Sequence, residues 1–309
     1  MAVVVPRITV AIPTYNRANV LRQTLEGVMR QRPIPGGFEV LVIDNNSRDA
    51  TRAVVEAFAG LPNAPRYLLE TNQGLDHARN RSIAEAKGEI LVLADDDILV
   101  EPDWLIELTA PFSHAHADRI GAVGGEVVPV FPDGLPAWVA EWHAPLAFRS
   151  DAGPLPMHQS PMGANLAFPV RVFRDHGMFS TTLDRKGSAL FSGGETEMLR
   201  RLRRAGLEVW FAPAARVLHQ MPASRTTFRY ATRHAFDSAR SRVVERGSAS
   251  FAYLASRFLG NLAKALGFLV MALLNLLLLR TGGAKKALVR AWRSCGYLYQ
   301  IPRTALGRV

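Results

Sequence analysis

Short apolar runs alternate with helical patterns over the first hundred residues of the chain. The runs predict strands at 7–12, 38–43, 66–69 and 90–94, and apolar residues at helical spacing predict helices between them at 20–29, 49–58 and 76–86. Strands that alternate with helices are typical of a parallel sheet covered on both faces. Ligands of such sheets bind at the carboxyl ends of the strands, so the residues that follow each run are the first candidates for function.

The fourth strand leads directly into three consecutive aspartates, Asp95, Asp96 and Asp97. Three carboxylates this close repel one another, and against a core strand they are costly to keep ionised unless a cation neutralises them. Hard oxygen ligands suit Mg²⁺ or Mn²⁺, and these ions commonly bind substrate phosphates. A solvated acidic turn at the strand end is the structural alternative, and the residues alone leave both interpretations open.

The regular alternation of strands and helices ends near residue 112. The stretch over 131–162 predicts long loops, which often carry function. The later elements are expected as helices at 104–112 and 195–205 and strands at 121–130, 163–168, 208–211 and 215–219. From residue 226 on, the pattern is helical and basic, so we expect one domain over 1–225 and a helical tail over 226–309.

Charge is distributed unevenly along the 309 residues. Residues 1–199 carry 17 Lys and Arg against 24 Asp and Glu, whereas residues 200–309 carry 20 against 3. This asymmetry predicts an anionic partner for the C-terminal part, which could be a membrane surface, a phosphate-bearing substrate or nucleic acid. The single cysteine, Cys295, excludes an intramolecular disulfide framework and a cysteine-based zinc site, and it favours a reducing compartment.

Residues 258–279 form an apolar run of 22 residues with one charge, Lys264. As a helix the run would be about 33 Å long, which is enough to span a bilayer. Basic residues lie on both sides, however, and give no clear positive-inside direction. An interfacial or re-entrant helix with both flanks cytoplasmic fits at least as well as a span, and the basic flanks would bind anionic lipid headgroups. A buried helix in a helical subdomain or an oligomer interface is the alternative.

Six segments, taken together and in order, match a known family. They are VAIPTYNR (10–17), VLVIDNNSRDAT (40–51), NQGLDHARNRSIAEAKGEILVLADDD (72–97), MGANLAF (162–168), GGETEMLRRLRRAG (193–206) and VLH (217–219). The combination, which covers about residues 7 to 220, resembles the family 2 glycosyltransferases, which are inverting enzymes that use nucleotide sugars. The resemblance implies an α/β fold of the GT-A type, which is Rossmann-like, with a mostly parallel sheet and helices on both faces.

The resemblance assigns nucleotide binding to residues that follow the first strands. These are Thr14, Tyr15, Asn16, Arg17, Asp44 and Arg79. Tyr15 would stack on the base, its neighbours would bind base or phosphate, and Asp44 would hold the base or ribose. Turn chemistry after the first strand, a helix cap at Asp44 and an ion pair at Arg79 are the structural alternatives.

The three aspartates correspond to the DxD motif of the family. The resemblance implies that Asp97 binds a divalent cation, Mn²⁺ or Mg²⁺, and that Asp95 and Asp96 bind ribose or metal. The cation would neutralise the charge of the departing nucleoside diphosphate. A histidine at the place of His219 can complete this metal or diphosphate site, although His219 is equally compatible with an ordinary structural role.

Inverting transfer needs a base that takes the proton from the acceptor hydroxyl. The family usually presents this base in a Gly-Glu-Asp-type segment, whereas the chain has Gly-Gly-Glu-Thr-Glu at 193–197. Glu195 is the closest match and is predicted to be the base, with Glu197 expected to bind acceptor. Both could instead simply favour the positive end of a helix. Asn165, in the fourth segment, is expected in the substrate pocket.

The implied function is transfer of a sugar from a nucleotide sugar, expected to be UDP-linked, to a hydroxyl of a lipid-linked or cell-surface saccharide. The expected setting is polysaccharide assembly at the cytoplasmic face of the membrane. A nucleotide-sugar-binding protein of the same fold that has lost catalysis is the main alternative. A nucleic-acid partner is not expected because no recognised motif accompanies the basic tail. A dinucleotide oxidoreductase is poorly supported because no glycine-rich turn follows the first strand.

Overall fold

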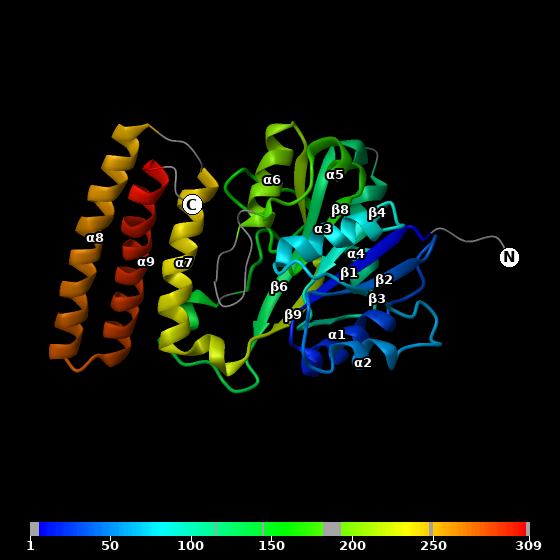
Figure 1. Cartoon of the computed structure of the whole chain (residues 1–309), viewed down its shortest axis with the longest axis horizontal. Coiled ribbons are helices and arrows are strands. Elements are labelled where there is room, and N and C mark those ends of the chain that lie inside the picture. The colour runs from blue at the N-terminus through cyan, green and yellow to red at the C-terminus, as the bar shows by residue number, and fades with distance from the viewer. Residues whose placement is uncertain (1–5, 115, 144, 182–192, 247–249, 307–309) are drawn as a thin grey trace. The chain divides into compact units, whose positions relative to one another are not determined.

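The computed structural model of the chain describes residues 6–114, 116–143, 145–181, 193–246 and 250–306 (Figure 1). Contacts divide the chain into two units. The sheet unit comprises Met1–Val130, Pro145–Thr181 and Gly194–Gln220, and the helical unit comprises Phe131–Ala144, Thr182–Gly193 and Met221–Val309. The C-terminal division falls between residues 220 and 221, close to the boundary expected at 225, and part of the long loop region groups with the C-terminal helices.

The first half of the sheet is parallel. Strand β1 (Ile8–Thr14) pairs in parallel with β2 (Phe38–Asp44) and with β4 (Ile90–Ala94), and β2 pairs in parallel with β3 (Arg66–Leu69). All five residues of β4 are buried. A strand covered on both faces needs a continuous apolar run rather than an alternating pattern, which is why the sequence predicts this half of the fold well.

The second half of the sheet is mixed. Strand β8 (Asn165–Pro169) is antiparallel to β4 and to β6 (Ile120–Val130). Strand β9 (Glu208–Gln220) is parallel to β6 and antiparallel to β5 (Ile98–Val100) and to β7 (Gly153–Pro154). The order is β3-β2-β1-β4-β8-β6-β9-β5, with β7 beside β9. The expectation of a mostly parallel sheet is therefore correct for β1 to β4, whereas in the second half only β6 and β9 pair in parallel and the sheet as a whole is mixed.

Two strands expected at 208–211 and 215–219 form the single strand β9. The pairing of β9 with β6 is irregular between Gly125 and Val127, where the partner residues jump from Ala212 to Val217. An irregularity of this kind lets one strand bend and continue, so an interrupted apolar pattern need not mark two strands.

Helices cover both faces of the sheet, as the sequence predicts. Helices α1 (Ala18–Met29), α2 (Thr51–Glu56) and α4 (Trp104–Thr109) contribute to one hydrophobic core, and α3 (Leu75–Glu85), α5 (Arg171–His176) and α6 (Gly194–Arg204) contribute to the other. Alternate residues of the central strands enter the two cores, because successive side chains of a strand point to opposite faces. In β1, for example, Val10 lies in the first core and Ala11 in the second.

The helical unit contains α7 (Phe228–Arg246), α8 (Phe251–Leu277) and α9 (Thr281–Ala305). Helix α9 contacts both α7 and α8, and the three lie side by side in Figure 1. Within the described residues, the segment Ala252–Leu277 is long and apolar enough to cross a membrane.

Candidate functional site

The loops after β1 and β2 are tied together by Asn16. Its backbone N–H donates to Ser47 Oγ at 2.9 Å, and its Oδ1 accepts from the backbone N–H of Arg48 at 2.7 Å. Asn16 has a φ of 53°, in the left-handed region that asparagine adopts at lower cost than most residues. The neighbouring Tyr15 is 42% exposed, which leaves its ring accessible for stacking.

Arg17 links the loop after β1 to the aspartates after β4. Its guanidinium lies 2.9 Å from Asp96 Oδ1 and donates to Asp97 Oδ2, while Thr14 Oγ1 donates to Asp96 Oδ2 at 2.7 Å. Burial raises the pKa of Asp96 to about 7, although Arg17 opposes this shift. Both oxygens of Asp96 are thus engaged inside the protein, and Asp96 joins two strand ends.

Asp95, Asp97 and His219 converge at the same strand end. His219 Nε2 lies 2.9 Å from Asp97 Oδ1 and 3.9 Å from Asp95 Oδ2. One possible ligand atom from each of the three residues lies within 4.8 Å of the others. The register of β5 with β9 sets Ile98 opposite His219, and this pairing brings the histidine beside the acids. Two carboxylates and an imidazole fit a divalent cation, and the nitrogen donor suits Mn²⁺ better than Mg²⁺.

Asp44 ends β2 within a hydrogen-bonded network. Its Oδ1 accepts from the backbone N–H of Ser47 at 2.8 Å, and its Oδ2 accepts from the Tyr67 hydroxyl at 2.7 Å. Burial and the hydrogen bond to Asp44 raise the pKa of Tyr67 to about 12, so the hydroxyl stays a donor at neutral pH. These contacts orient the carboxylate, and its contact with base or ribose stays a prediction.

Arg79 lies between two carboxylates. It donates to Asp76 Oδ1 at 2.8 Å and to Glu195 Oε2 at 3.2 Å, and its guanidinium is 5.4 Å from the centre of the Phe179 ring. Burial lowers the pKa of Arg79, but Glu195 and Asp76 outweigh burial and keep it raised. Arg79 is 4% exposed, so its geometry favours positioning of Glu195 over the nucleotide contact expected from the sequence.

One residue of this cluster, Asp76, was not predicted from the sequence, and the close packing at Gly163 and Gly194 was not expected although both lie in the matched segments. A Cβ at Gly194 would lie 2.1 Å from Asp76 Oδ2, and a Cβ at Gly163 would lie 2.5 Å from Arg79 Nη2. Both glycines therefore allow close approach to the Arg79 cluster. The available signal was the acid three residues before Arg79 on a predicted helix, a spacing at which side chains meet.

Glu197 is held within α6. Its carboxylate accepts from Arg201 Nε at 3.1 Å and from a second nitrogen of the same guanidinium, one helical turn away. Arg201 also donates to the backbone carbonyls of His176 and Met178, which lie at the end of α5 and just after it. The arrangement gives Glu197 a role in joining two helices, and the predicted acceptor contact is untested.

Asn165 is fully buried at the junction of three strands. Its Nδ2 donates to the carbonyls of Glu126 at 3.1 Å and Ala215 at 2.6 Å, and its Oδ1 accepts from Trp104 Nε1 at 2.9 Å. The residue was expected in the substrate pocket. The strand turns its side chain into the core instead, where it satisfies groups at the irregular part of β9, so we interpret Asn165 as structural.

Replacing Asn165 by alanine is expected to lower the free energy of unfolding by about 2 to 4 kcal/mol. The indole N–H of Trp104 and the carbonyls of Glu126 and Ala215 would lose their hydrogen bonds to the Asn165 side chain. Urea denaturation would measure the change. Asn19→Ala, at an exposed position of α1, is the control and should stay within about 0.5 kcal/mol of the parent. Unchanged stability with a raised KM for donor would instead indicate a substrate contact.

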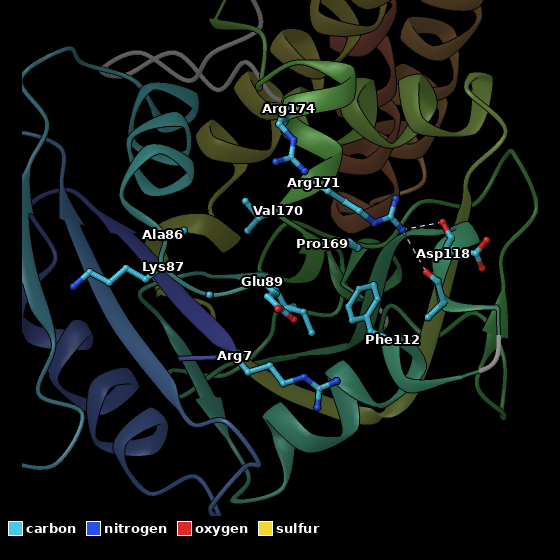
Figure 2. A pocket seen from close by; sticks show the side chains of 13 residues that line it. Arg7, Ala86, Lys87, Glu89, Phe112, Asp118, Pro169, Val170, Arg171 and Arg174 are labelled. Atoms are coloured by element: carbon cyan, nitrogen blue, oxygen red, sulfur yellow. Dashed lines mark hydrogen bonds between the residues drawn. The ribbon is translucent and has the colours of Figure 1, made fainter. Parts of the chain in front are cut away.

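A separate cleft of about 690 Å³ lies at the other edge of the sheet, near the amino ends of β1 and β4 (Figure 2). Arg7, Lys87 and Arg174 contribute to its lining, and Arg171 donates to the carbonyl of Asp118 at 2.8 Å. The predicted site residues are not among those that line it. We therefore place the functional site at the strand ends after β1, β2 and β4, where the candidate metal ligands lie, and not in this cleft.

Comparison with known proteins identifies the family of the chain. The profile of the family described as Glycosyl transferase family 2 matches residues 9–177. The chain belongs to glycosyl transferase family 2. The family resemblance found in the sequence is therefore confirmed, and so is the assignment of the chain as a glycosyltransferase.

Two similar proteins come from Haloferax volcanii. The chain is 27% identical over 228 residues to its Glucosyl-dolichyl phosphate glucuronosyltransferase, covering 72% of each chain. It is 30% identical over 220 residues to Glycosyltransferase AglE, covering 69% of this chain and 66% of that protein. Among solved structures, mannosyltransferase PcManGT from Pyrobaculum calidifontis, in complex with GDP-Man and Mn²⁺, superposes with a TM-score of 0.58 at 19% identity. That match covers 98% of this chain and 74% of PcManGT, and it confirms the GT-A fold of this family 2 glycosyltransferase.

Proposed function

We propose that this family 2 glycosyltransferase inverts the anomeric configuration as it moves a sugar from a nucleoside diphosphate to an acceptor hydroxyl. One observation carries the proposal. Asp95, Asp97 and His219 form a possible metal site, and Arg79 interacts electrostatically with both Asp95 and Glu195. The site therefore combines candidate metal ligands at the strand ends with a carboxylate at the start of α6. The reaction needs both, a cation for the diphosphate and a base for the acceptor hydroxyl.

The donor would bind at the carboxyl ends of β1, β2 and β4. Tyr15 offers an exposed ring to the base. Asp44 is only 3% exposed and already accepts hydrogen bonds from Ser47 and Tyr67, and its predicted contact with base or ribose would use the remaining acceptor capacity of the carboxylate. Asp95, Asp97 and His219 would hold Mn²⁺ or Mg²⁺, which when bound supplies positive charge to the diphosphate. We expect a UDP-linked donor.

Glu195 would act as the base. It takes the proton from the acceptor hydroxyl while that oxygen attacks the anomeric carbon, and the bond from this carbon to the diphosphate oxygen breaks on the opposite side. Arg79 Nη1 lies 3.2 Å from Glu195 Oε2 and so restrains the carboxylate. Glu195 is part-buried, with a side chain 21% exposed, which leaves it reachable by an acceptor.

A lipid-linked acceptor is supported by one relative, whose name describes a glucuronosyltransferase acting on a glucosyl-dolichyl phosphate. The apolar α8 supports action at a membrane surface. The single cysteine favours a reducing compartment, which agrees with the cytoplasmic face as the location. A cell-surface saccharide is then the expected product.

Thermal unfolding against a panel of nucleoside diphosphates and nucleotide sugars tests the proposal. Binding to the folded state raises the Tm by mass action, and a ligand at about 100 times its Kd should raise it by about 5 °C. We expect this shift with one nucleotide in Mn²⁺ and its loss with chelator. The absence of a shift with every nucleotide would contradict the proposal, and a shift without sugar release or transfer would favour a non-catalytic binding protein.

A further inference from the structure

Helix α8 has two different faces. Asn261, Ala265 and Ala272 form a buried stripe, with at most 5% of each residue exposed. The outer stripe is formed by Leu259, Leu262, Leu266, Leu269 and Leu273, which are 40 to 64% exposed. Successive residues of the outer stripe are three or four positions apart, and those of the buried stripe are four or seven positions apart. Each of these spacings places the residues of a stripe on one side of a helix. The outer stripe is therefore an apolar surface that the described part of the chain leaves uncovered.

The buried stripe packs along the length of α9. Arg257, near the start of α8, lies 5.5 Å from the centre of the Tyr297 ring in the second half of α9. Asn275, near the end of α8, lies against Gly283 at the start of α9, where a Cβ would be 2.1 Å from Asn275 Oδ1. The two helices are joined by residues 278–280 and thus form an antiparallel hairpin packed from end to end.

Helix α9 is unsuited to the interior of a bilayer. It carries Lys285, Lys286, Arg290 and Arg293, and its other side packs on α7. Charged side chains are strongly disfavoured among acyl chains. If α8 crossed a membrane while packed in this hairpin, it would take α9 with it. The length and composition of α8 would allow it to cross a membrane, but its packing against the charged helix α9 opposes this.

Insertion of the hairpin tip first is opposed for the same reason. Leu277, Leu278 and Leu279 at the tip are 71%, 63% and 87% exposed. Arg280 follows directly, and Lys285 lies little more than one helical turn into α9. The tip could therefore enter only a short way before charged side chains reached the acyl chains, whereas the side of α8 presents an apolar surface along its length.

The outer surface is too broad for a seam between two copies of the chain. A coiled-coil seam is flanked by charged residues, which fix the partner and the register. The positions beside the outer stripe are instead occupied by Val270 and Leu274, which are 57% and 52% exposed. A wide apolar surface bordered by basic residues, including Arg257 and Lys264, suits lipid with anionic headgroups.

We propose that α8 docks side-on into one leaflet of an anionic membrane and does not cross it. The apolar surface lies at the boundary of headgroups and acyl chains, and the basic residues of α8 and α9 contact the headgroups. This inference deepens the membrane location in the proposed function and rests on that function for its setting. It does not depend on catalysis, and its test needs no nucleotide.

Flotation with vesicles tests the surface. The full chain should bind vesicles that contain phosphatidylglycerol and bind vesicles of phosphatidylcholine alone more weakly. The combined substitutions Leu266→Gln, Leu269→Gln and Leu273→Gln should weaken binding at least about tenfold, because they remove exposed apolar contacts. Leu61→Gln with Leu69→Gln, exposed leucines of the sheet unit, is the control and should bind as the parent does. Equal binding by the triple variant would overturn the proposal.

Labelling of the two ends of α8 tests the side-on orientation. Ser256→Cys and Thr281→Cys, each in a Cys295→Ser background, are added to preformed vesicles and treated from outside with a membrane-impermeant maleimide. Both exposed positions should react as fully as they do in detergent. Protection of either position would indicate a span. Failure to bind vesicles, together with a dimer that the triple variant dissociates, would assign the surface to a second copy instead.

Discussion

Replacing Asp97 by asparagine is expected to reduce sugar transfer by about 10³-fold and to remove the dependence of nucleotide binding on a divalent cation. Asp97 is fully buried and contacts both Arg17 and His219, so the lost charge cannot be replaced by a neighbouring surface group. Loss of a group that stabilises developing charge typically has an effect of this size. Donor hydrolysis or transfer, and calorimetric titration with and without Mn²⁺, would measure the two effects.

Asp103→Asn is the matched control for this substitution. Asp103 carries the same charge but pairs with Arg32 at 2.9 Å on the surface, with a side chain 41% exposed. Surface ion pairs contribute little, so activity should stay within about twofold of the parent. The Tm of both variants separates lost function from unfolding. Metal-dependent nucleotide binding that survives in folded Asp97→Asn would contradict the assignment of this metal site.

Replacing Glu195 by glutamine is expected to lower kcat by about 10² to 10⁴-fold while the affinity for donor stays within about threefold. Glutamine keeps the size of the side chain and can still accept from Arg79, but it cannot take the proton of the acceptor hydroxyl. Separate determination of kcat and of donor binding distinguishes a catalytic loss from a binding loss. A rise in KM for donor with unchanged kcat would remove Glu195 from the role of base.

Glu197→Gln provides the comparison within the same helix. Glu197 lies two residues further along and binds Arg201, which in turn joins α6 to the end of α5. We expect a modest loss of stability and a kcat within about tenfold of the parent. If Glu197→Gln lowered kcat more than Glu195→Gln does, the two assignments would have to be exchanged.

The parallel half of the fold is predictable because local pattern and tertiary environment agree there. A strand such as β4, buried on both faces, must be apolar throughout, and its flanking turns mark its ends. Whether β8 runs parallel or antiparallel to β4 cannot be predicted in the same way, because the same apolar pattern is compatible with both. Neither its antiparallel pairing with β4 nor the continuity of β9 through its irregular region follows from local pattern.

The candidate site is predictable to the extent that its residues sit next to strand ends. Asp95 and Asp97 follow a buried strand directly, and family resemblance adds His219, which the pairing of β5 with β9 then brings beside them. The contact of Arg79 with Glu195 joins residues 116 positions apart and depends on how α3 and α6 pack. The burial of the Asn165 side chain likewise depends on neighbouring strands. From the sequence alone, a polar side chain in a short strand could point either into the core or towards the substrate.

The anomeric configuration of the released sugar tests inverting transfer most directly. Once thermal unfolding has identified the donor, proton NMR follows its hydrolysis at an enzyme concentration high enough that release outpaces mutarotation. Water then replaces the acceptor, so the lipid or saccharide need not be known. From an α-linked donor, we expect the β-sugar as the first product. The α-sugar as first product would contradict a single displacement with Glu195 as base.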